Sequence, residues 1–175
     1  MNIKSLAATL AVLALLAAPA VRAADQPWPD LGFLLGDWEG GGSGKPGQGS
    51  GSFSFTPDLQ DQVLVRRSHS EYPAAEGRPA TVHDDLMIVY AQKSPQASYF
   101  DNEGHVIHYG VTVDQGAHTA TFTSDDPAPS PGFRLIYKQV AADQLRVTFE
   151  ISPTGKAADF KMCLDGMVTR RHGPR

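Results

Sequence analysis

Paired histidines and acids are the residues of this sequence whose types and spacing could do chemistry. His69 and Glu71 are two positions apart, as are His83 and Asp85, so the members of each pair would point to one side of an extended strand. A carboxylate beside an imidazole can orient the ring for general-base work, but such pairs also occur on ordinary exposed strand faces. The sequence therefore offers two His–carboxylate pairs without assigning a catalytic residue.

The remaining histidine-rich stretch does not have metal-ligand spacing. His105 and His108 are three positions apart, so they would point to opposite faces of a strand and could not share a metal ion without a bulge. Asp101 and Glu103 precede them, but acidic residues are common in turns. We expect no metal site here.

Nucleophile and phosphate-binding signatures are missing as well. The run Gly49-Ser50-Gly51-Ser52 lacks the Gly-x-Ser-x-Gly spacing of a nucleophile elbow. The glycine-rich stretch that contains it leads into a predicted strand rather than a helix, unlike a phosphate loop. Cys163 is the only cysteine, so it cannot form an internal disulfide, and its strand-like surroundings predict a buried thiol.

The structural elements that would position these residues are predicted β-strands, seen as short segments in which apolar and polar residues alternate. The pattern is clearest at 144–152, where Leu145, Val147 and Phe149 alternate with polar residues. Between two segments, residues 101–104 suit a tight turn with a left-handed glycine at Gly104. The predicted strands are 36–42, 51–55, 63–72, 80–92, 96–100, 105–114, 117–124, 133–140, 144–152 and 160–171. Regular short strands with tight turns predict an all-β fold, a single antiparallel up-and-down β-barrel of about ten strands.

Such a barrel would enclose a space that side chains do not easily fill. An enclosed space lined by apolar and aromatic residues is the usual site for a small ligand. By alternation, the expected lining residues are Phe55, Tyr90, Tyr109, Phe122, Tyr137 and Phe149. The same residues could instead pack a filled core, and the sequence leaves both possibilities open.

The first residues have the pattern of a signal peptide. Lys4 precedes an apolar run at 6–18, and Val21-Arg22-Ala23 places small residues where a signal peptidase reads. The apolar run is shorter than the ~20 residues of a spanning helix, although an uncleaved anchor is the alternative. We expect cleavage after Ala23, a mature domain at 24–175, and an exported protein, periplasmic or secreted, that is not inserted in a membrane.

Composition fits a single exported domain. The chain has 175 residues, of which 41% are hydrophobic, enough for one packed core. Its formal net charge is -4, with no long basic block. Nucleic-acid binding is therefore not expected, because the basic surface that it needs is missing.

The first predicted strand carries a motif that resembles a known family. Gly36-Asp37-Trp38 follows a short apolar turn, and this arrangement looks like the opening of the calycin barrels, which include lipocalins and fatty-acid-binding proteins. In lipocalins the tryptophan closes one barrel end, and an arginine of the last strand packs across its ring. The resemblance implies that Trp38 meets Arg170, or Arg171 if a bulge changes the parity of the strand.

The wider run 33–40 also resembles uncharacterised exported bacterial barrel proteins and the ten-stranded, haem-binding nitrobindin-like barrels. The second resemblance implies haem as a possible cofactor, held by a histidine near the C-terminal strand. In this sequence the nearby histidine is His172, which lies beyond the last apolar residue. An inward histidine would have to replace it, and His108 and His69 are the candidates.

These observations favour non-catalytic binding of a small hydrophobic or amphipathic molecule inside an exported barrel. A tyrosine or arginine within the barrel would fix a polar head. Three alternatives remain: a haem or porphyrin binder, an isomerase or hydrolase that uses the barrel pocket, and a filled structural barrel without a ligand.

Overall fold

A computed structural model describes residues 28–41, 49–125 and 130–173 of the chain. The predicted signal peptide, 1–23, lies outside the described residues. Among the described residues, no helix is long and apolar enough to cross a membrane.

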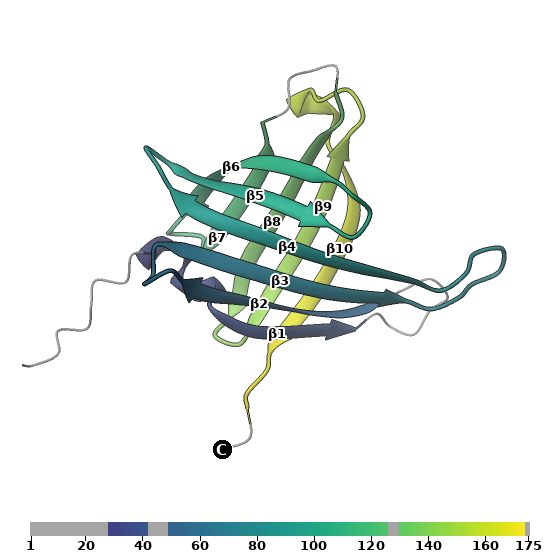
Figure 1. Cartoon of the computed structure of the whole chain (residues 1–175), viewed down its shortest axis with the longest axis horizontal. Helices are drawn as coiled ribbons and strands as arrows, with labels where there is room; N and C mark the ends of the chain where they lie inside the picture. The colour runs from purple at the N-terminus through teal and green to yellow at the C-terminus, as the bar shows by residue number, and fades with distance from the viewer. Residues whose placement is uncertain (1–27, 42–48, 126–129, 174–175) are drawn as a thin grey trace, which may run out of the picture.

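Ten antiparallel strands form one closed barrel, in which each strand pairs with its neighbours in sequence and β1 pairs with β10 (Figure 1). The predicted all-β, up-and-down barrel is therefore confirmed. The strands are β1 (Gly36–Gly41), β2 (Ser50–Asp58), β3 (Val63–Tyr72), β4 (Thr81–Ala91), β5 (Pro95–Asp101), β6 (Val106–Asp114), β7 (Thr119–Ser124), β8 (Gly132–Ala141), β9 (Gln144–Ser152) and β10 (Lys161–Arg170). Two short 3-10 helices, η1 (Pro29–Leu34) and η2 (Ala157–Asp159), precede β1 and β10.

Along most strands, inward and outward side chains alternate as predicted; the exceptions are β4 and the first half of β10. In β4 the buried residues are Met87 and Val89, so Tyr90 lies on the outer side of the strand. The expectation that Tyr90 lines the interior was wrong. Both faces of this segment carry apolar side chains, so a period of two could not tell which one is inward.

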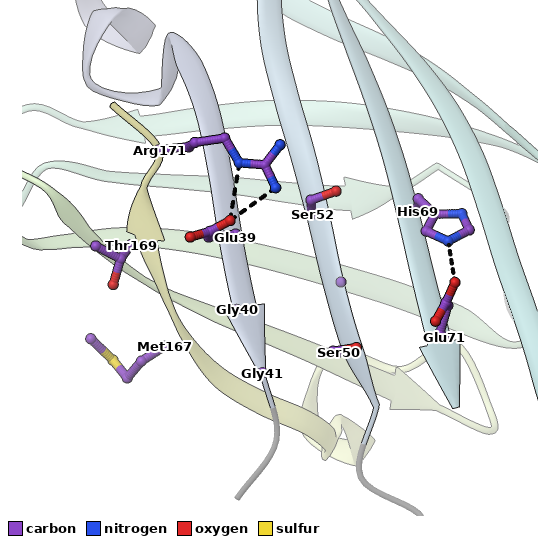
Figure 2. Close-up of a pocket in the computed structure, with 11 residues that line it drawn as sticks. Glu39, Gly40, Gly41, Ser50, Ser52, His69, Glu71, Met167, Thr169 and Arg171 are labelled. Atoms are coloured by element: carbon purple, nitrogen blue, oxygen red, sulfur yellow. Dashed lines mark hydrogen bonds and ion pairs between the residues drawn. The ribbon is translucent and has the colours of Figure 1, made fainter. Parts of the chain in front are cut away.

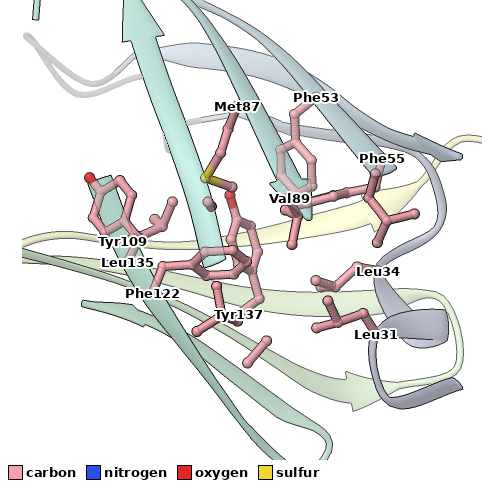
Figure 3. Packing of buried hydrophobic residues seen from close by; sticks show 14 of the residues in the cluster. Leu31, Leu34, Phe53, Phe55, Met87, Val89, Tyr109, Phe122, Leu135 and Tyr137 are labelled. Carbon is pink, nitrogen blue, oxygen red and sulfur yellow. The ribbon is translucent and has the colours of Figure 1, made fainter. Parts of the chain in front are cut away.

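The helix η1 covers one end of the barrel. Its Leu31 and Leu34 are 1% and 0% exposed and face the inward aromatic side chains (Figure 3). Just before the helix, the indole nitrogen of Trp28 donates to the Asp61 carbonyl in the β2–β3 turn at 3.0 Å. We call this the covered end.

Towards the other end, which we call the far end, the inward side chains become more exposed. Met87, Val89 and Phe122 are 0% exposed, whereas several inward residues nearer the far end are 8–9% exposed: Tyr99, Ile107, Leu135 and Val147. Beyond them, Phe133 and Phe149 are only partly buried. Solvent therefore reaches the inward side chains from the far end.

The last strand is irregular in its first half. Its register with β9 shifts between Met162 and Leu164, and β1 pairs only with the other end of β10, through Trp38–Arg170 and Glu39–Thr169. Cys163 is exposed, so the prediction of a buried thiol was wrong. A bulge leaves one residue of a strand unpaired, and no local pattern of residues indicated it.

The β5–β6 turn has the predicted form. Gly104 has a φ of +91°, and its N–H donates to the Asp101 carbonyl at 3.2 Å. One carboxylate oxygen of Asp101 also accepts the backbone N–H groups of Glu103 and His105, at 3.0 and 2.9 Å. This turn lies at the far end.

Candidate functional site

A buried ion pair faces the interior between β3 and β4. Arg66 shares the inward face of β3 with Leu64, and it is 7% exposed. Its Nη1 group donates to Oδ1 of Asp85 on β4, and the two side chains are 8% and 5% exposed. The β3–β4 register pairs Ser68 with Asp85, so Arg66 and Asp85 are diagonal neighbours on the inward face.

Two aromatic rings flank this guanidinium. The Arg66 Cζ atom lies 5.2 Å from the ring centroid of Phe53 and 5.9 Å from that of Tyr137, within the range of cation–π attraction. Burial alone would lower the pKa of Arg66, but Tyr137, Asp85 and two further tyrosines together outweigh it, and the pKa lies above its ordinary value. Arg66 is therefore charged at neutral pH.

Two polar atoms at this position lack a hydrogen-bond partner. Nε of Arg66 and the hydroxyl of Tyr137 are both buried, and neither has a partner among the described residues. Burial raises the pKa of Tyr137, so its hydroxyl is neutral and can both donate and accept. Buried polar groups are nearly always paired, and an unpaired one is costly. Each of the two atoms therefore retains the capacity for one further hydrogen bond.

A chain of polar contacts connects the ion pair to the far end. Nε2 of His83 lies 3.9 Å from Asp85 and 2.9 Å from the Tyr99 hydroxyl. The Tyr99 hydroxyl donates to Oδ2 of Asp101 at 3.3 Å, and the same oxygen lies 2.8 Å from Nδ1 of His105. Burial and the nearby carboxylates of Asp85 and Asp101 raise the pKa of Tyr99, so it stays neutral within this chain.

Four of the six predicted lining residues pack against one another. Phe55 and Tyr137 have ring centroids 5.4 Å apart, Phe122 and Tyr137 5.8 Å, and Tyr109 and Phe122 6.4 Å (Figure 3). Phe149 also faces inward, nearer the far end, and stacks on Phe133 at 6.2 Å. A ligand-binding role for these residues stays a prediction, since they also form the packed middle of the barrel.

The histidines considered for haem do not face the interior. His108 is exposed on the outer side of β6, where its Nδ1 lies 3.2 Å from the Ser98 hydroxyl, and His69 lies on the outer side of β3. The expectation that either is inward was wrong, because their strands place the neighbouring residues, Ile107 and Arg66, on the inward face. The described residues contain no group of three or more His, Cys, Asp or Glu side chains placed to hold a metal ion.

An open hollow of about 520 Å³ lies on the outer side of β10, β1, β2 and β3 (Figure 2). One side carries the Arg171–Glu39 pair and the other the His69–Glu71 pair, at 3.0 and 3.1 Å. Hydrogen bonds with Asp84 and Glu71 raise the pKa of His69. These ion pairs are about half exposed, and exposed pairs contribute little to stability.

At the covered end, Arg170 packs across the ring of Trp38. The Arg170 Cζ atom lies 4.2 Å from the ring centroid. Arg170 also donates to the carbonyls of Leu35 and, at 3.3 Å, Phe33, while the Trp38 indole donates to the Leu34 carbonyl at 2.8 Å. Arg170, rather than Arg171, therefore occupies the position that the resemblance implies.

Sequence comparisons do not place the chain in a family. No protein-family model matches it, and no curated protein sequence matches it significantly. The closed ten-stranded antiparallel barrel is consistent with a calycin-like barrel, and such a barrel fits a binding protein.

Proposed function

We propose that this chain is an exported binding protein that holds a small amphipathic molecule in the far half of the barrel, with its polar head at Arg66 and Tyr137. The observation that carries the proposal is the pair of buried, unpartnered polar atoms on these two side chains. A ligand oxygen that accepted from Arg66 Nε would remove the cost of leaving that donor unpaired.

The apolar part of the ligand would contact the inward side chains of the far half. Ile107, Leu135 and Val147 are 8–9% exposed there, and Phe133 and Phe149 lie beyond them. Burial of apolar surface contributes roughly 25 cal/mol per Å² before the entropic cost of association. This contact would supply most of the affinity, and the hydrogen bonds at Arg66 would set the orientation.

Kinship with lipocalins or nitrobindin-like barrels is part of the proposal. Its support is the arrangement of Gly36, Trp38 and Arg170 at the covered end. Export rests on the pattern of residues 1–23.

A filled barrel without a ligand is the second candidate. The mutual packing of Phe55, Phe122 and Tyr137 favours it, because these rings occupy the middle of the barrel. A direct binding measurement separates the two functions.

The test uses two fluorescent probes, dansylaminoundecanoic acid and its primary amide, titrated into the mature protein. We expect at least one to bind saturably at one molecule per chain. Ile107→Trp, which enlarges an inward side chain, should weaken binding about tenfold or more, or ~1.4 kcal/mol. Val106→Trp is the matched control, because Val106 is the preceding residue and is 58% exposed, so its affinity should not change.

Two outcomes would contradict the proposal. If neither probe binds the wild-type protein, the filled barrel is the better description. If Ile107→Trp binds the probes as tightly as Val106→Trp does, the probes bind elsewhere. Circular dichroism of both variants checks that each is folded.

A further inference from the structure

The inward charges on β3, β4 and β5 are unequal in number. The guanidinium is already paired with Asp85, whose side chain is 5% exposed. A second inward carboxylate, that of Asp101, is 3% exposed and belongs to the same polar chain through Tyr99. Burial would raise the pKa of Asp101, but hydrogen bonds from the backbone and side chain of His105 and from the backbone of Glu103 outweigh it and lower the pKa, so this group is also ionised at neutral pH.

We propose that the site selects an uncharged polar head over a carboxylate, and that Asp85 determines this preference. The inference rests on the proposed function and names the class of ligand for the same site: an amphipathic molecule whose head is a carbonyl, amide, ester or hydroxyl.

The hydrogen bonds that Arg66 and Tyr137 leave unmade determine which polar atoms the ligand's head group must supply. Arg66 directs Nη1 to Asp85, and its Nε is the unpaired donor. A neutral carbonyl oxygen can accept from Nε, and an adjacent polar atom can pair with the Tyr137 hydroxyl. This exchange satisfies both buried groups and adds no net charge to the interior.

A carboxylate head group would add a second negative charge next to the Arg66–Asp85 pair. It would lie on the opposite side of a guanidinium that Asp85 has already neutralised, so the buried group would become one cation between two anions. Like charges in a poorly solvated site repel strongly. The second anion would gain a hydrogen bond from Nε and lose its own hydration, which one shared guanidinium does not replace.

Other groups face this site from the neighbouring strands. His83 lies 3.9 Å from Asp85 and adds a positive charge when it is protonated. Tyr99, Tyr109 and Tyr137 are held neutral, because burial raises the pKa of each hydroxyl. The two head groups are therefore compared at a single pH of about 8, at which the carboxylate probe is ionised.

The experiment measures both dansyl probes on three proteins. In the wild type, the amide should bind about tenfold or more tightly than the carboxylate, since a neighbouring like charge commonly shifts the ionisation of a buried carboxyl by at least one pKa unit. Asp85→Asn keeps the side-chain shape and removes the charge, so it should reverse the order. Asp84→Asn is the matched control, because Asp84 is the preceding residue, on the outer side of β4 and 55% exposed, and it should keep the wild-type order.

The outcomes separate this inference from the proposed function. A wild-type protein that binds the carboxylate as tightly as the amide, with both weakened by Ile107→Trp, overturns the head-group preference and leaves the binding function standing. A preference for the amide that Asp85→Asn leaves intact overturns the role of Asp85. Failure of both probes to bind the wild type overturns both proposals. The wild-type comparison of the two probes requires no variant, so it remains decisive if Asp85→Asn does not fold.

Discussion

The guanidinium carbon of Arg170 lies 4.2 Å from the centroid of the Trp38 ring, and the two residues are direct partners across β1 and β10. This contact joins the first and last strands at the point where the barrel closes. Arg170 also donates to the carbonyls of Phe33, in the last turn of η1, and Leu35, which follows the helix; the last carbonyls of a helix have no partner within it. One side chain therefore links strand closure to the helix that covers the end.

The first prediction concerns this closure. Trp38 is 0% exposed, so Trp38→Ala should lower the free energy of unfolding by roughly 3–5 kcal/mol. Arg170→Ala should cost less, and the double variant should cost less than the sum, because each single change already removes their shared contact. Urea unfolding of the four proteins measures this difference, expected at ~0.5–3 kcal/mol.

A control substitution at the neighbouring arginine tests whether the Trp38–Arg170 contact is responsible. Arg171→Ala removes an exposed arginine next in sequence, whose partner is Glu39, and it should change stability by less than ~1 kcal/mol. Strictly additive losses at Trp38 and Arg170 would show that their contact contributes nothing to closure.

The second prediction concerns Gly36, the glycine of the Gly36-Asp37-Trp38 motif. Gly36 has a φ of +110°, and a Cβ atom there would lie 2.6 Å from Nη1 of Arg170. That nitrogen donates to the Leu35 carbonyl, so making room for the methyl group would disrupt this hydrogen bond, and Gly36→Ala should destabilise the protein by more than the ~1–2 kcal/mol of a left-handed backbone alone. Gly41→Ala is the control on the same strand, because a Cβ there would meet nothing within 4 Å. Thermal unfolding of both variants gives the comparison, and equal losses would contradict it.

Much of this fold can be read from local sequence, because strands and turns depend on nearby residues. The alternation at 144–152 and the left-handed Gly104 were both predicted from a few neighbouring positions. The β4 strand was harder, since both of its faces are apolar and only pairing with β3 decides which is inward. Cys163 lies in the first half of β10, where residues 161–165 are all exposed and β1 is not paired, which no local pattern indicated.

The candidate site depends still more on pairing between strands. Alternation places Arg66 on the same face as Leu64, but a charged residue on an apolar face is not recognised as buried until its partner is known. That partner, Asp85, is on the next strand and becomes a neighbour only through the β3–β4 register. The pairing of His83 with Asp85 on one face was predicted from their spacing, whereas the Tyr99 contact required the β4–β5 register.

The third prediction concerns pH. The pKa of Asp101 is lower in the folded protein than in the unfolded chain, so the carboxylate stabilises the fold at pH values above its unfolded pKa, about 3.9. This stabilisation is lost as pH falls through the lower, folded pKa. Asp101→Asn should therefore be less stable than the wild type at neutral pH, and the difference should shrink below about pH 4. Urea unfolding across this range measures it, and a difference independent of pH would contradict the assignment.

The fourth prediction concerns export, which rests on residues 1–23. If Val21 and Ala23 are the positions that a signal peptidase reads, the exported protein begins at Ala24, and N-terminal sequencing of that form will identify this residue. Ala23→Trp places a bulky ring at the cleavage position and should leave an uncleaved precursor. Arg22→Trp is the matched control, because the side chain between the two positions is not read, and it should be processed normally. An exported protein that still begins at Met1, or equal processing of the two variants, would show that this segment is not removed as proposed.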